Sequence, residues 1–348
     1  MNVGEIRTIN CSKITDDTFK LSDIASSFSI IPLETNDSCL IGEISKLEFF
    51  NENIFVLDKI YSARLFVFSK NGKFLYDIGK RGTAPDEYIQ INDFSISRKK
   101  NLIYVLCDKK KVFSYSLSGQ YMGQIALDLS ADAMEYQDDS FYFICDQVKR
   151  GNLIVTDMKG NVKYEDFANE HMGENLFMLI HPFLRRDSTL LYRRYLDNNI
   201  YEIDSDRSTV RYKVDFGKNK IELDDLKDMP HQKVKDKLTY SRGKIKYLVE
   251  NEDYMQALFF DNNMPCISVY NKKNTINNVY FFKNYIDDLS GLPSPLFEFV
   301  TERNEFVAVI QPSIIGEIDN LTEMGQMVFR NVDVSDDSNP ILYIIKTK

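Results

Sequence analysis

The chain has 348 residues, of which 43% are hydrophobic and 27% are charged, so it can bury a core and remain soluble. Its formal net charge of −9 excludes a uniform attraction to nucleic acid or to an anionic membrane surface. No apolar run reaches the length of about 18 residues that a membrane span needs, and the opening MNVGEIRTINCSK lacks the apolar core of a signal peptide.

The five cysteines are widely spaced, without a CxxC pair or a close cysteine–histidine cluster, so a zinc site is not expected. Cys107 and Cys145 lie inside apolar runs, which predicts buried thiols. The basic clusters 98–100 and 109–111 flank the strand-like run 101–108, and this position favours solvated turns over a site for polyanions.

The first strand-like segment in the chain is FSIIPLE (28–34), which has no partner nearby in the sequence. After it, a short apolar and aromatic run that ends in Asp recurs along the chain. These runs are NIFVLD (53–58), LIYVLCD (102–108), FYFICD (141–146), LLYRRYLD (190–197) and ALFFD (257–261), with a weaker sixth, FVAVIQ (306–311), that ends in Gln. Their length and their content predict β-strands.

Each of these runs is followed by a second run, a turn and a third run, as in LFVFSKNGKFLYDIG (65–79). Gly72, Gly119 and Gly160 lie in three of the turns, 47 and 41 residues apart, where glycine accepts the positive φ of a tight hairpin. One more strand precedes each Asp-ended run. These strands are ISKLEFF (44–50), DFSIS (93–97), DAMEY (132–136), FMLIH (177–181), KYLVE (246–250) and LFEFV (296–300). Four strands in a repeat of roughly 40–50 residues are typical of a β-propeller blade.

The repeat predicts an all-β fold, a six-bladed β-propeller of four-stranded antiparallel blades with short helical insertions on one face. The sixth unit contains ILYIIK (341–346) but lacks a fourth strand, so we expect the strand at 28–34 to complete this blade and close the ring. The predicted organisation is an N-terminal extension, 1–27, and one propeller domain, 28–348, with insertions at 217–245 and 312–339. A pair of β-sandwiches is the alternative, but it predicts no regular unit of four strands.

Two stretches resemble a known family: IIPLETNDSCLIGEISKLEFFNENIFVLD, and LFVFSKNGKFLYDIGKRG continuing into PDEY. They are similar to the six-bladed β-propeller proteins of Bacteroides-type bacteria, which are related to NHL-repeat-like or TolB-like propellers. The loop that usually reads G-x-G-P-G-E-Y in that family stands here as GTAPDEY (82–88), with one glycine replaced. The resemblance covers about residues 5–348 and includes the ending DDSNPILYIIKTK (336–348).

The resemblance also implies a location. Members of the family are commonly exported, often as lipoproteins. We therefore expect an extracytoplasmic protein of the periplasm or cell surface, with a signal segment, and a lipid anchor where there is one, on a part of the protein that is missing from this chain.

The connections of a propeller indicate which face carries function. Loops between second and third strands emerge on the same face as the connections from one blade to the next. The long segments 79–91, 217–245 and 312–339 all belong to this face, and long loops in compact domains tend to be functional. IELDDLKDM (221–229) and NLTEMGQMVF (320–329) have helical spacing and are expected either to cap the channel mouth or to form a lid over it.

Six residues are candidates for ligand binding. Lys80 and Arg81 could contact an anionic ligand at the channel mouth, and Tyr88 could anchor their loop on the next blade, although a brace between blades is the alternative. His181 ends an inner-strand candidate and could face the channel, but a lone histidine is more often a packing residue. Arg193 and Arg194, in LLYRRYLD, complete the candidate set.

Carboxylates offer a second kind of site. The Asp residues that end the runs could form a ring around a cation, but closing a turn by accepting a backbone N–H is the favoured interpretation. Carboxylates on the inner-strand candidates could reach the channel, depending on strand register; they are Glu48, Asp93, Glu135, Glu250 and Glu298. No hydrolase, P-loop or zinc-protease motif is present in the sequence.

Two functions remain. We favour a non-catalytic recognition module that binds a glycan, peptide or protein at the long-loop face around the central channel. The alternative is a metal-dependent lyase or hydrolase at the channel mouth, with a divalent cation in the channel as the only cofactor considered. No catalytic residue and no metal ligand is assigned from the sequence.

Overall fold

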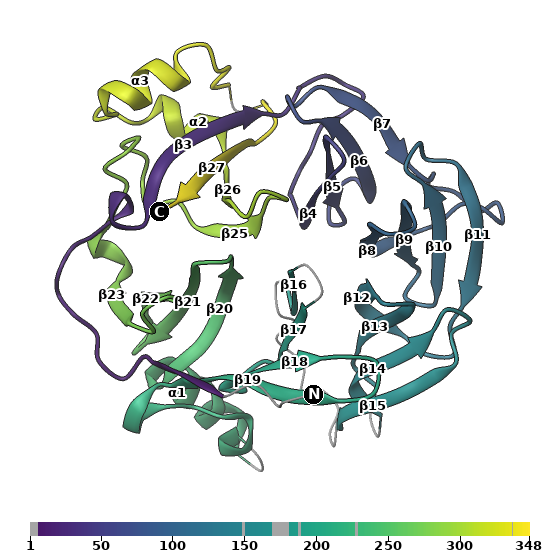
Figure 1. The fold of residues 1–348 in the computed structure, drawn as a ribbon, viewed down its shortest axis with the longest axis horizontal. Helices are drawn as coiled ribbons and strands as arrows, with labels where there is room; N and C mark the ends of the chain where they lie inside the picture. The colour runs from purple at the N-terminus through teal and green to yellow at the C-terminus, as the bar shows by residue number, and fades with distance from the viewer. Residues whose placement is uncertain (1–5, 148–149, 169–180, 187–188, 227–228, 336) are drawn as a thin grey trace.

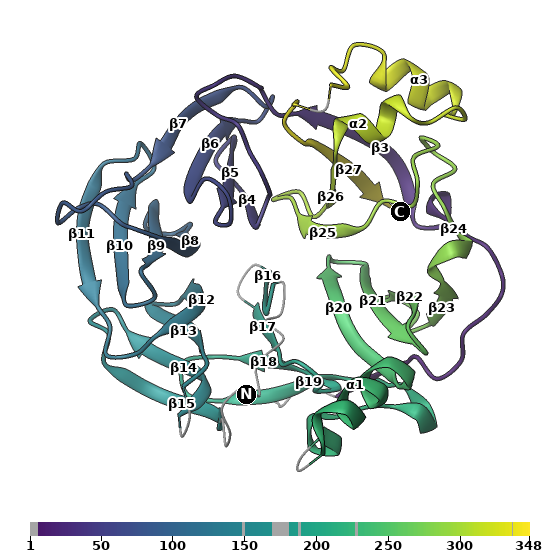
Figure 2. The ribbon, with the colours of Figure 1, turned by 180° about the vertical axis from the view of Figure 1, so that it is seen from behind.

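Six sheets stand radially around a central axis in the computed structural model of the chain (Figures 1 and 2). The structure describes residues 6–147, 150–168, 181–186, 189–226, 229–335 and 337–348. Each sheet is a blade of four antiparallel strands with its first strand innermost, and one blade carries an added parallel strand. The predicted six-bladed β-propeller is therefore confirmed.

Blades 1 to 3 follow the predicted repeat. Blade 1 contains β4 (Lys46–Phe50), β5 (Asn53–Asp58), β6 (Arg64–Ser69) and β7 (Phe74–Ile78). Blade 2 contains β8 (Ile91–Ser97), β9 (Leu102–Cys107), β10 (Lys111–Ser116) and β11 (Tyr121–Ala126). Blade 3 contains β12 (Ala131–Gln137), β13 (Ser140–Cys145), β14 (Gly151–Asp157) and β15 (Val162–Ala168).

Blades 4 to 6 complete the ring. Blade 4 contains β16 (Phe183–Arg186), β17 (Thr189–Arg193), β18 (Asn199–Ile203) and β19 (Ser208–Asp215). Blade 5 contains β20 (Arg242–Glu250), β21 (Tyr254–Asp261), β22 (Met264–Asn271) and β23 (Asn277–Phe281). Blade 6 contains β25 (Phe297–Val300), β26 (Phe306–Ile310), β27 (Ile341–Thr347) and β3 (Ala25–Pro32). The inner strand of blade 4 is thus β16, and not FMLIH (177–181), of which residues 177–180 lie outside the described part of the chain.

The two ends of the chain meet in blade 6. Strand β3 pairs with β27 in antiparallel register, from Ile341 opposite Pro32 to Lys346 opposite Ser27. The ring of Phe28 stacks on that of Tyr343, with the ring centroids 5.3 Å apart. The predicted closure by the N-terminal strand is therefore confirmed.

The segment before β3 runs outside the ring from blade 4, past blade 5, to blade 6, and is the purple trace in Figure 1. Its strand β1 (Arg7–Asn10) pairs in parallel with β19, and β2 (Phe19–Lys20) pairs in parallel with β24 (Tyr285–Ile286), which follows blade 5. We call residues 6–24 the N-terminal strap. Because it pairs with structure in blade 4 and after blade 5, the strap links neighbouring blades on their outer side.

Both faces of each sheet are buried, since each blade packs between two others. The buried apolar residues that the structure describes form six clusters, one at each interface between blades. In β5, Phe55 and Leu57 join the cluster with blade 2, whereas Ile54 and Val56 join the cluster with blade 6. This two-sided burial explains why the second strands read as continuous apolar runs rather than as alternating patterns.

Hairpin glycines in blades 1 to 3 lie close to the backbone of the preceding blade. Gly72 has φ +80°, and a Cβ on it would lie 2.0 Å from the carbonyl oxygen of Pro32 at the end of β3. Gly119 and Gly160 repeat this arrangement in blades 2 and 3, with positive φ; a Cβ on them would lie 3.3 and 3.2 Å from a carbonyl oxygen of the preceding blade. The glycines are therefore required by the turn and by the close approach of two backbones.

Three α-helices occur among the described residues: α1 (His231–Tyr240), α2 (Pro312–Gly316) and α3 (Glu323–Phe329). Helix α3 lies within NLTEMGQMVF, as predicted, and the Thr322 side chain accepts a hydrogen bond from the Gly325 N–H at its start. Of IELDDLKDM, the described residues contain a short 3₁₀ turn, η3 (Leu223–Leu226), and residues 227–228 lie outside the described part of the chain; α1 begins after Pro230. Pro230 starts the helix because its fixed φ suits a first turn.

The remaining 3₁₀ turns are η1 (Leu21–Asp23), η2 (Gly217–Asn219) and η4 (Phe282–Asn284). Figures 1 and 2, which look along the short axis of the molecule, show α1, α2 and α3 at the perimeter of the ring. They do not lie over the centre, so the expectation that these insertions cap or gate the channel mouth is wrong.

Deleting residues 1–34 removes β3 and the strap, so it leaves β27 with an unpaired edge and opens the ring. We expect the thermal unfolding midpoint to fall by several degrees. A milder variant, Phe28→Ala, removes only the stacked ring and should lower the free energy of unfolding by about 1–3 kcal/mol, because Phe28 is half-buried. Unchanged thermal melting of the deletion variant, followed by circular dichroism, would contradict the closure.

Candidate functional site

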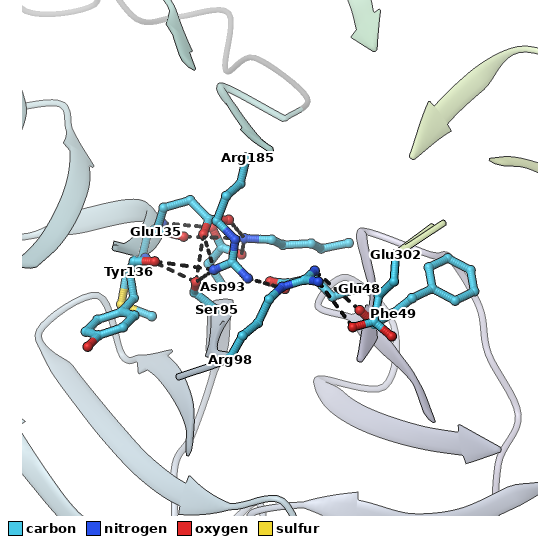
Figure 3. A network of polar contacts seen from close by, with 11 residues as sticks. Glu48, Phe49, Asp93, Ser95, Arg98, Glu135, Tyr136, Arg185 and Glu302 are labelled. Atoms are coloured by element: carbon cyan, nitrogen blue, oxygen red, sulfur yellow. Dashed lines mark hydrogen bonds and ion pairs between the residues drawn. The ribbon is translucent and has the colours of Figure 1, made fainter. Parts of the chain in front are cut away.

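The inner strands of blades 1 to 4 bring a group of charged side chains together at the centre of the ring (Figure 3). Lys46, on β4, places its Nζ 2.6 Å from Glu135 Oε1 and 3.1 Å from Asp93 Oδ1. Burial alone would lower the pKa of Lys46, but the carboxylates of Asp93 and Glu135 outweigh burial and raise it. The lysine is therefore charged at neutral pH.

Arg185, on β16, is the second cation of this group. Its guanidinium lies 3.2 Å from Glu48 Oε2 and 3.4 Å from Glu135 Oε2, and it donates to Ser95 Oγ at 3.0 Å. Burial opposes ionisation of Glu135, but Lys46 and Arg185 hold its pKa below the usual value. Burial dominates at Glu48 and raises the pKa of that carboxyl group.

We call these residues (Lys46, Glu48, Asp93, Glu135 and Arg185) the channel network. Each side chain is at least four-fifths buried, with Lys46 16% and Arg185 12% exposed. Two cations and three carboxylates from four blades pair with one another, with Glu48 Oε1 left without a hydrogen-bond partner in the described structure, and this pairing fixes the inner strands at the axis. The channel network is therefore a polar core that connects blades 1 to 4.

A histidine and a carboxylate flank the channel network. His181 Nε2 lies 3.6 Å from Glu298 Oε2 on β25, and the imidazole packs edge-on against Phe299, with ring centroids 4.8 Å apart. Burial lowers the pKa of His181, so the ring is neutral at neutral pH. His181 has a left-handed backbone, φ +54°, which is uncommon for a residue with a Cβ and recurs at functional sites.

Two adjoining cavities lie on the long-loop side of the channel network. The larger, about 440 Å³, is lined by residues at the starts of inner strands and the ends of second strands, among them Lys46, Lys59, His181 and Glu298. The smaller, about 310 Å³, lies between blades 3 and 4 and includes Arg193 and Arg194. They share Asp132, Ala133 and Pro182. We call the pair the mouth cavities; their lining comes from the long-loop face predicted from topology.

A third space of about 110 Å³ continues along the channel and is lined by Lys46, His181 and Glu298 together with Arg185. The mouth cavities therefore lead down to the channel network, which fills the centre. A ligand at the mouth would meet these charged side chains at its inner end.

Arg193 is a structural residue within this site. It is 3% exposed, and its guanidinium donates to the carbonyl oxygens of His181, Ile245 and Lys246 at 3.3, 2.8 and 2.9 Å. Burial lowers its pKa to about 10, which leaves it charged at neutral pH. Arg193 thus links blade 4 to blade 5 and holds the backbone of His181 in place.

The loop at 79–91 has a different location from the mouth cavities. Tyr88 is 2% exposed and packs in the cluster between blades 1 and 2, while Lys80 lies 3.1 Å from Glu87 with its side chain 80% exposed. The backbones of Arg81 and Tyr88 form an isolated bridge. Among the candidate residues, the structure brings together His181, Arg193 and Arg194; it does not place Lys80, Arg81 or Tyr88 on the lining of either mouth cavity.

The Asp residues at the ends of the second strands close turns. Asp58 is fully buried and accepts hydrogen bonds from the N–H groups of Gly42, Tyr61 and Ser62. Asp108 and Asp197 likewise accept backbone N–H groups. Asp261 instead pairs with Arg242 at 2.8 Å. The favoured interpretation as turn residues is confirmed for Asp58 and Asp197, whereas Asp108 accepts from the loop that precedes β8 rather than from its own turn.

The inner-strand carboxylates divide into two groups. Glu48, Asp93 and Glu135 belong to the channel network, whereas Glu250 contacts Lys272 and accepts a hydrogen bond from Tyr212. Within the part of the chain that the structure describes, no group of three or more His, Cys, Asp or Glu side chains is placed to hold a metal ion.

The sequence matches one known family over most of its length. A family model described as 6-bladed beta-propeller, DUF5128, matches residues 2–309. The chain belongs to this family. DUF5128 membership confirms the predicted resemblance at the level of a six-bladed propeller family. No curated protein matches the sequence.

Solved structures share the fold of this DUF5128 chain. One from Bacteroides fragilis NCTC 9343, named "Putative exported protein", has a TM-score of 0.81 at 19% identity and covers 99% of this chain and 100% of that chain. The Cps50 (Swd1) beta-propeller domain of Myceliophteria thermophila is more distant, with a TM-score of 0.47 at 10% identity, and covers 91% of this chain and 100% of that chain. BamB of Moraxella catarrhalis has a TM-score of 0.40 at 11% identity and covers 80% of this chain and 71% of that chain. At 19% identity, the likeness to the B. fragilis protein shows the fold alone.

None of the helices formed by the described residues is both long and apolar enough to cross a bilayer.

Sequence reasoning missed the two cations of the channel network. Arg185 follows the predicted inner strand of blade 4, so the shifted strand hid it. Lys46 lies within ISKLEFF, and an isolated lysine inside an apolar inner strand was the one available signal, because such a residue needs a buried partner.

Replacing Lys46 with Met leaves Asp93 and Glu135 buried beside a single remaining cation, so we expect a loss of about 3–5 kcal/mol in the free energy of unfolding at pH 7. Lys59→Met makes the same change of charge at the mouth, and should cost less than about 0.5 kcal/mol. Chemical denaturation of both variants measures the difference.

The pH dependence gives a second readout. In the native protein the depressed pKa of Glu135 contributes stability above its unfolded pKa, and this contribution is lost as pH falls through the folded pKa. Without Lys46, burial raises the pKa of Glu135. Protonation of Glu135 at lower pH then removes the cost of burying a carboxylate that has lost one of its two cations. The gap in stability between native protein and Lys46→Met should therefore narrow from pH 7 to pH 5; a gap that widens would contradict the pairing.

Proposed function

We propose that this protein is a non-catalytic recognition propeller that binds a polar ligand in the mouth cavities at its long-loop face. The observation that carries the proposal is the pair of adjoining cavities, about 440 and 310 Å³, that ends on the channel network. Binding sites typically have volumes of roughly 300–1,000 Å³. The ends of inner and second strands, and the loops that adjoin them, supply the lining.

The chemistry of the lining also supports binding. The walls combine charged groups with aromatic and amide side chains, including Tyr247, Asn92 and Gln311. Most of the deep charges are engaged in the channel network, so they shape the cavity floor and are held in fixed positions. A preorganised polar floor is typical of a recognition site. Glycans, peptides and protein segments all offer matching donors and acceptors.

We also propose an extracytoplasmic location, in the periplasm or at the cell surface, with a lipid anchor on a preceding segment. Support comes from the B. fragilis protein of the same fold, which is named as exported. The relation to NHL-repeat-like or TolB-like propellers stays part of this proposal and rests on the GTAPDEY loop and the repeat.

Glycan and peptide arrays test the binding proposal, with a blocking variant as the control for location. Ala133 lines both mouth cavities, so Ala133→Phe should fill the passage between them and abolish or reduce binding about tenfold or more. Ala126→Phe, on the exposed end of β11, adds the same bulk elsewhere and should leave binding unchanged. Binding that survives Ala133→Phe would place the ligand outside the mouth cavities and contradict the proposal.

A further inference from the structure

Negatively charged side chains outnumber positively charged ones on the lining of the larger mouth cavity. Four carboxylates line it against two lysines. Asp93 is paired with Lys46 at 3.1 Å, and Asp132 is paired with Lys109 at 2.6 Å. Neither Glu43 nor Glu298 forms an ion pair with a lysine or arginine in the part of the chain that the structure describes.

The carboxylates of Glu43 and Glu298 both affect the pKa of Tyr247. Burial raises the pKa of Tyr247, and the carboxylates of Glu298 and Glu43 raise it further. All three residues line the larger mouth cavity. This corner therefore presents two carboxylates and a phenol oxygen to a ligand. Lys246 lies over the ring of Tyr247, 5.2 Å from its centroid, and is not part of the lining.

His181 supplies an independent observation at this corner. Its Nε2 is buried without a hydrogen-bond partner in the described structure, although His181 lines the cavity and Nε2 lies only 3.6 Å from Glu298 Oε2. Buried polar atoms are nearly always partnered, so an orphan on a cavity wall indicates a missing group. With the ring proton on Nδ1, Nε2 is an acceptor, and a donor that reaches both Nε2 and Glu298 Oε2 would satisfy both atoms.

An exposed aromatic ring belongs to the residue that follows the lining residue Ile60 in the sequence. Ile60 lines the cavity, and Tyr61, the next residue, is 70% exposed. The ring of Tyr61 is held against Gly42, where a Cβ would lie 2.6 Å from it, and Asp58 fixes its backbone N–H. A rigid exposed tyrosine beside carboxylates favours a cation, which the face of an aromatic ring attracts.

We propose that the larger mouth cavity binds a primary ammonium group, held by Glu298 and Glu43 and facing Tyr247. This inference rests on the proposed binding function and names the chemistry of its ligand. An ammonium has three N–H donors and one positive charge, so it matches two carboxylates and an acceptor nitrogen where a neutral or anionic group does not. The net charge of −9 favours the approach of such a cation from a distance.

Two ligand sources carry this group: an amino sugar and the side chain of lysine. The probes are glucosamine oligomers and an N-terminally acetylated, lysine-containing peptide. Each is compared by calorimetry with its own N-acetylated form, which keeps the shape and removes the charge. We expect the free amine of one source to bind at least about tenfold more tightly than its acetylated form. The source that shows this difference is the natural class.

Glu298→Gln and Glu43→Gln should each weaken binding of the amine about ten- to hundredfold, because each removes a charge-assisted hydrogen bond. Glu302→Gln is the matched control, since Glu302 pairs with Arg98 beyond the far end of β25 and makes the same change of charge. It should leave binding unchanged. Thermal melting of all three variants checks that they fold.

Several results would overturn the proposal. Equal binding of amine and acetylated probes, equal loss in Glu302→Gln, or no binding of either amine at millimolar concentration would each do so. Array binding that is sensitive to Ala133→Phe but shows no preference for amines would overturn the ammonium inference and leave the recognition function standing. Array binding that ignores Ala133→Phe would overturn the recognition site itself.

Discussion

The antiparallel pairing of β3 with β27 is the interaction on which the ring depends, because it joins segments near the two ends of the chain in one blade. Without it, two blade edges would face solvent with unpaired backbone groups and with apolar faces that pack on no neighbour. The strap adds parallel pairing at blade 4 and after blade 5, on the outer side of the ring. All six interfaces between blades therefore rely on a closure that uses very distant parts of the sequence.

Closure also defines the central axis of the ring, and the buried charged side chains of the channel network lie at this axis. The outer parts of the blades pack through apolar clusters, whereas the inner strands of blades 1 to 4 meet through the channel network. Buried ion pairs add little net stability but strongly disfavour arrangements that leave one charge unpaired. The channel network thus fixes the relative positions of the inner strands and gives the mouth cavities a rigid charged floor.

Most of the fold was predictable from the sequence, because the same unit of four strands recurs along the chain. The Asp-ended runs marked the second strand of the blades, and Gly72, Gly119 and Gly160 marked hairpins that the structure confirms. Strand β1 was missed because RTIN is short and pairs in parallel with a strand about 200 residues away. Helix α1 was not expected, because the helical spacing of IELDDLKDM lies before Pro230, whereas the α-helix begins after it.

The site was less predictable, for a physical reason. Charged side chains meet only when register and closure are known: the contact between Lys46 and Glu135 spans 89 residues, and that between Arg185 and Glu48 spans 137. Lys80 and Arg81 stand out in the sequence because they lie in a basic loop with glycines, yet Tyr88 ties that loop to the packing between two blades. His181 was selected on its position alone, and its partner Glu298 became visible only in three dimensions.

Closure by the two ends of the chain has a consequence for synthesis. Ribosomes extend a chain by roughly 5–20 residues per second, so β3 would emerge on the order of tens of seconds before β27 exists. During that time β3 has no partner strand, and the five other blades cannot close into a ring because the sixth is incomplete. Such long-range pairing is slow, and it leaves unpaired strand edges exposed to aggregation until the ring closes.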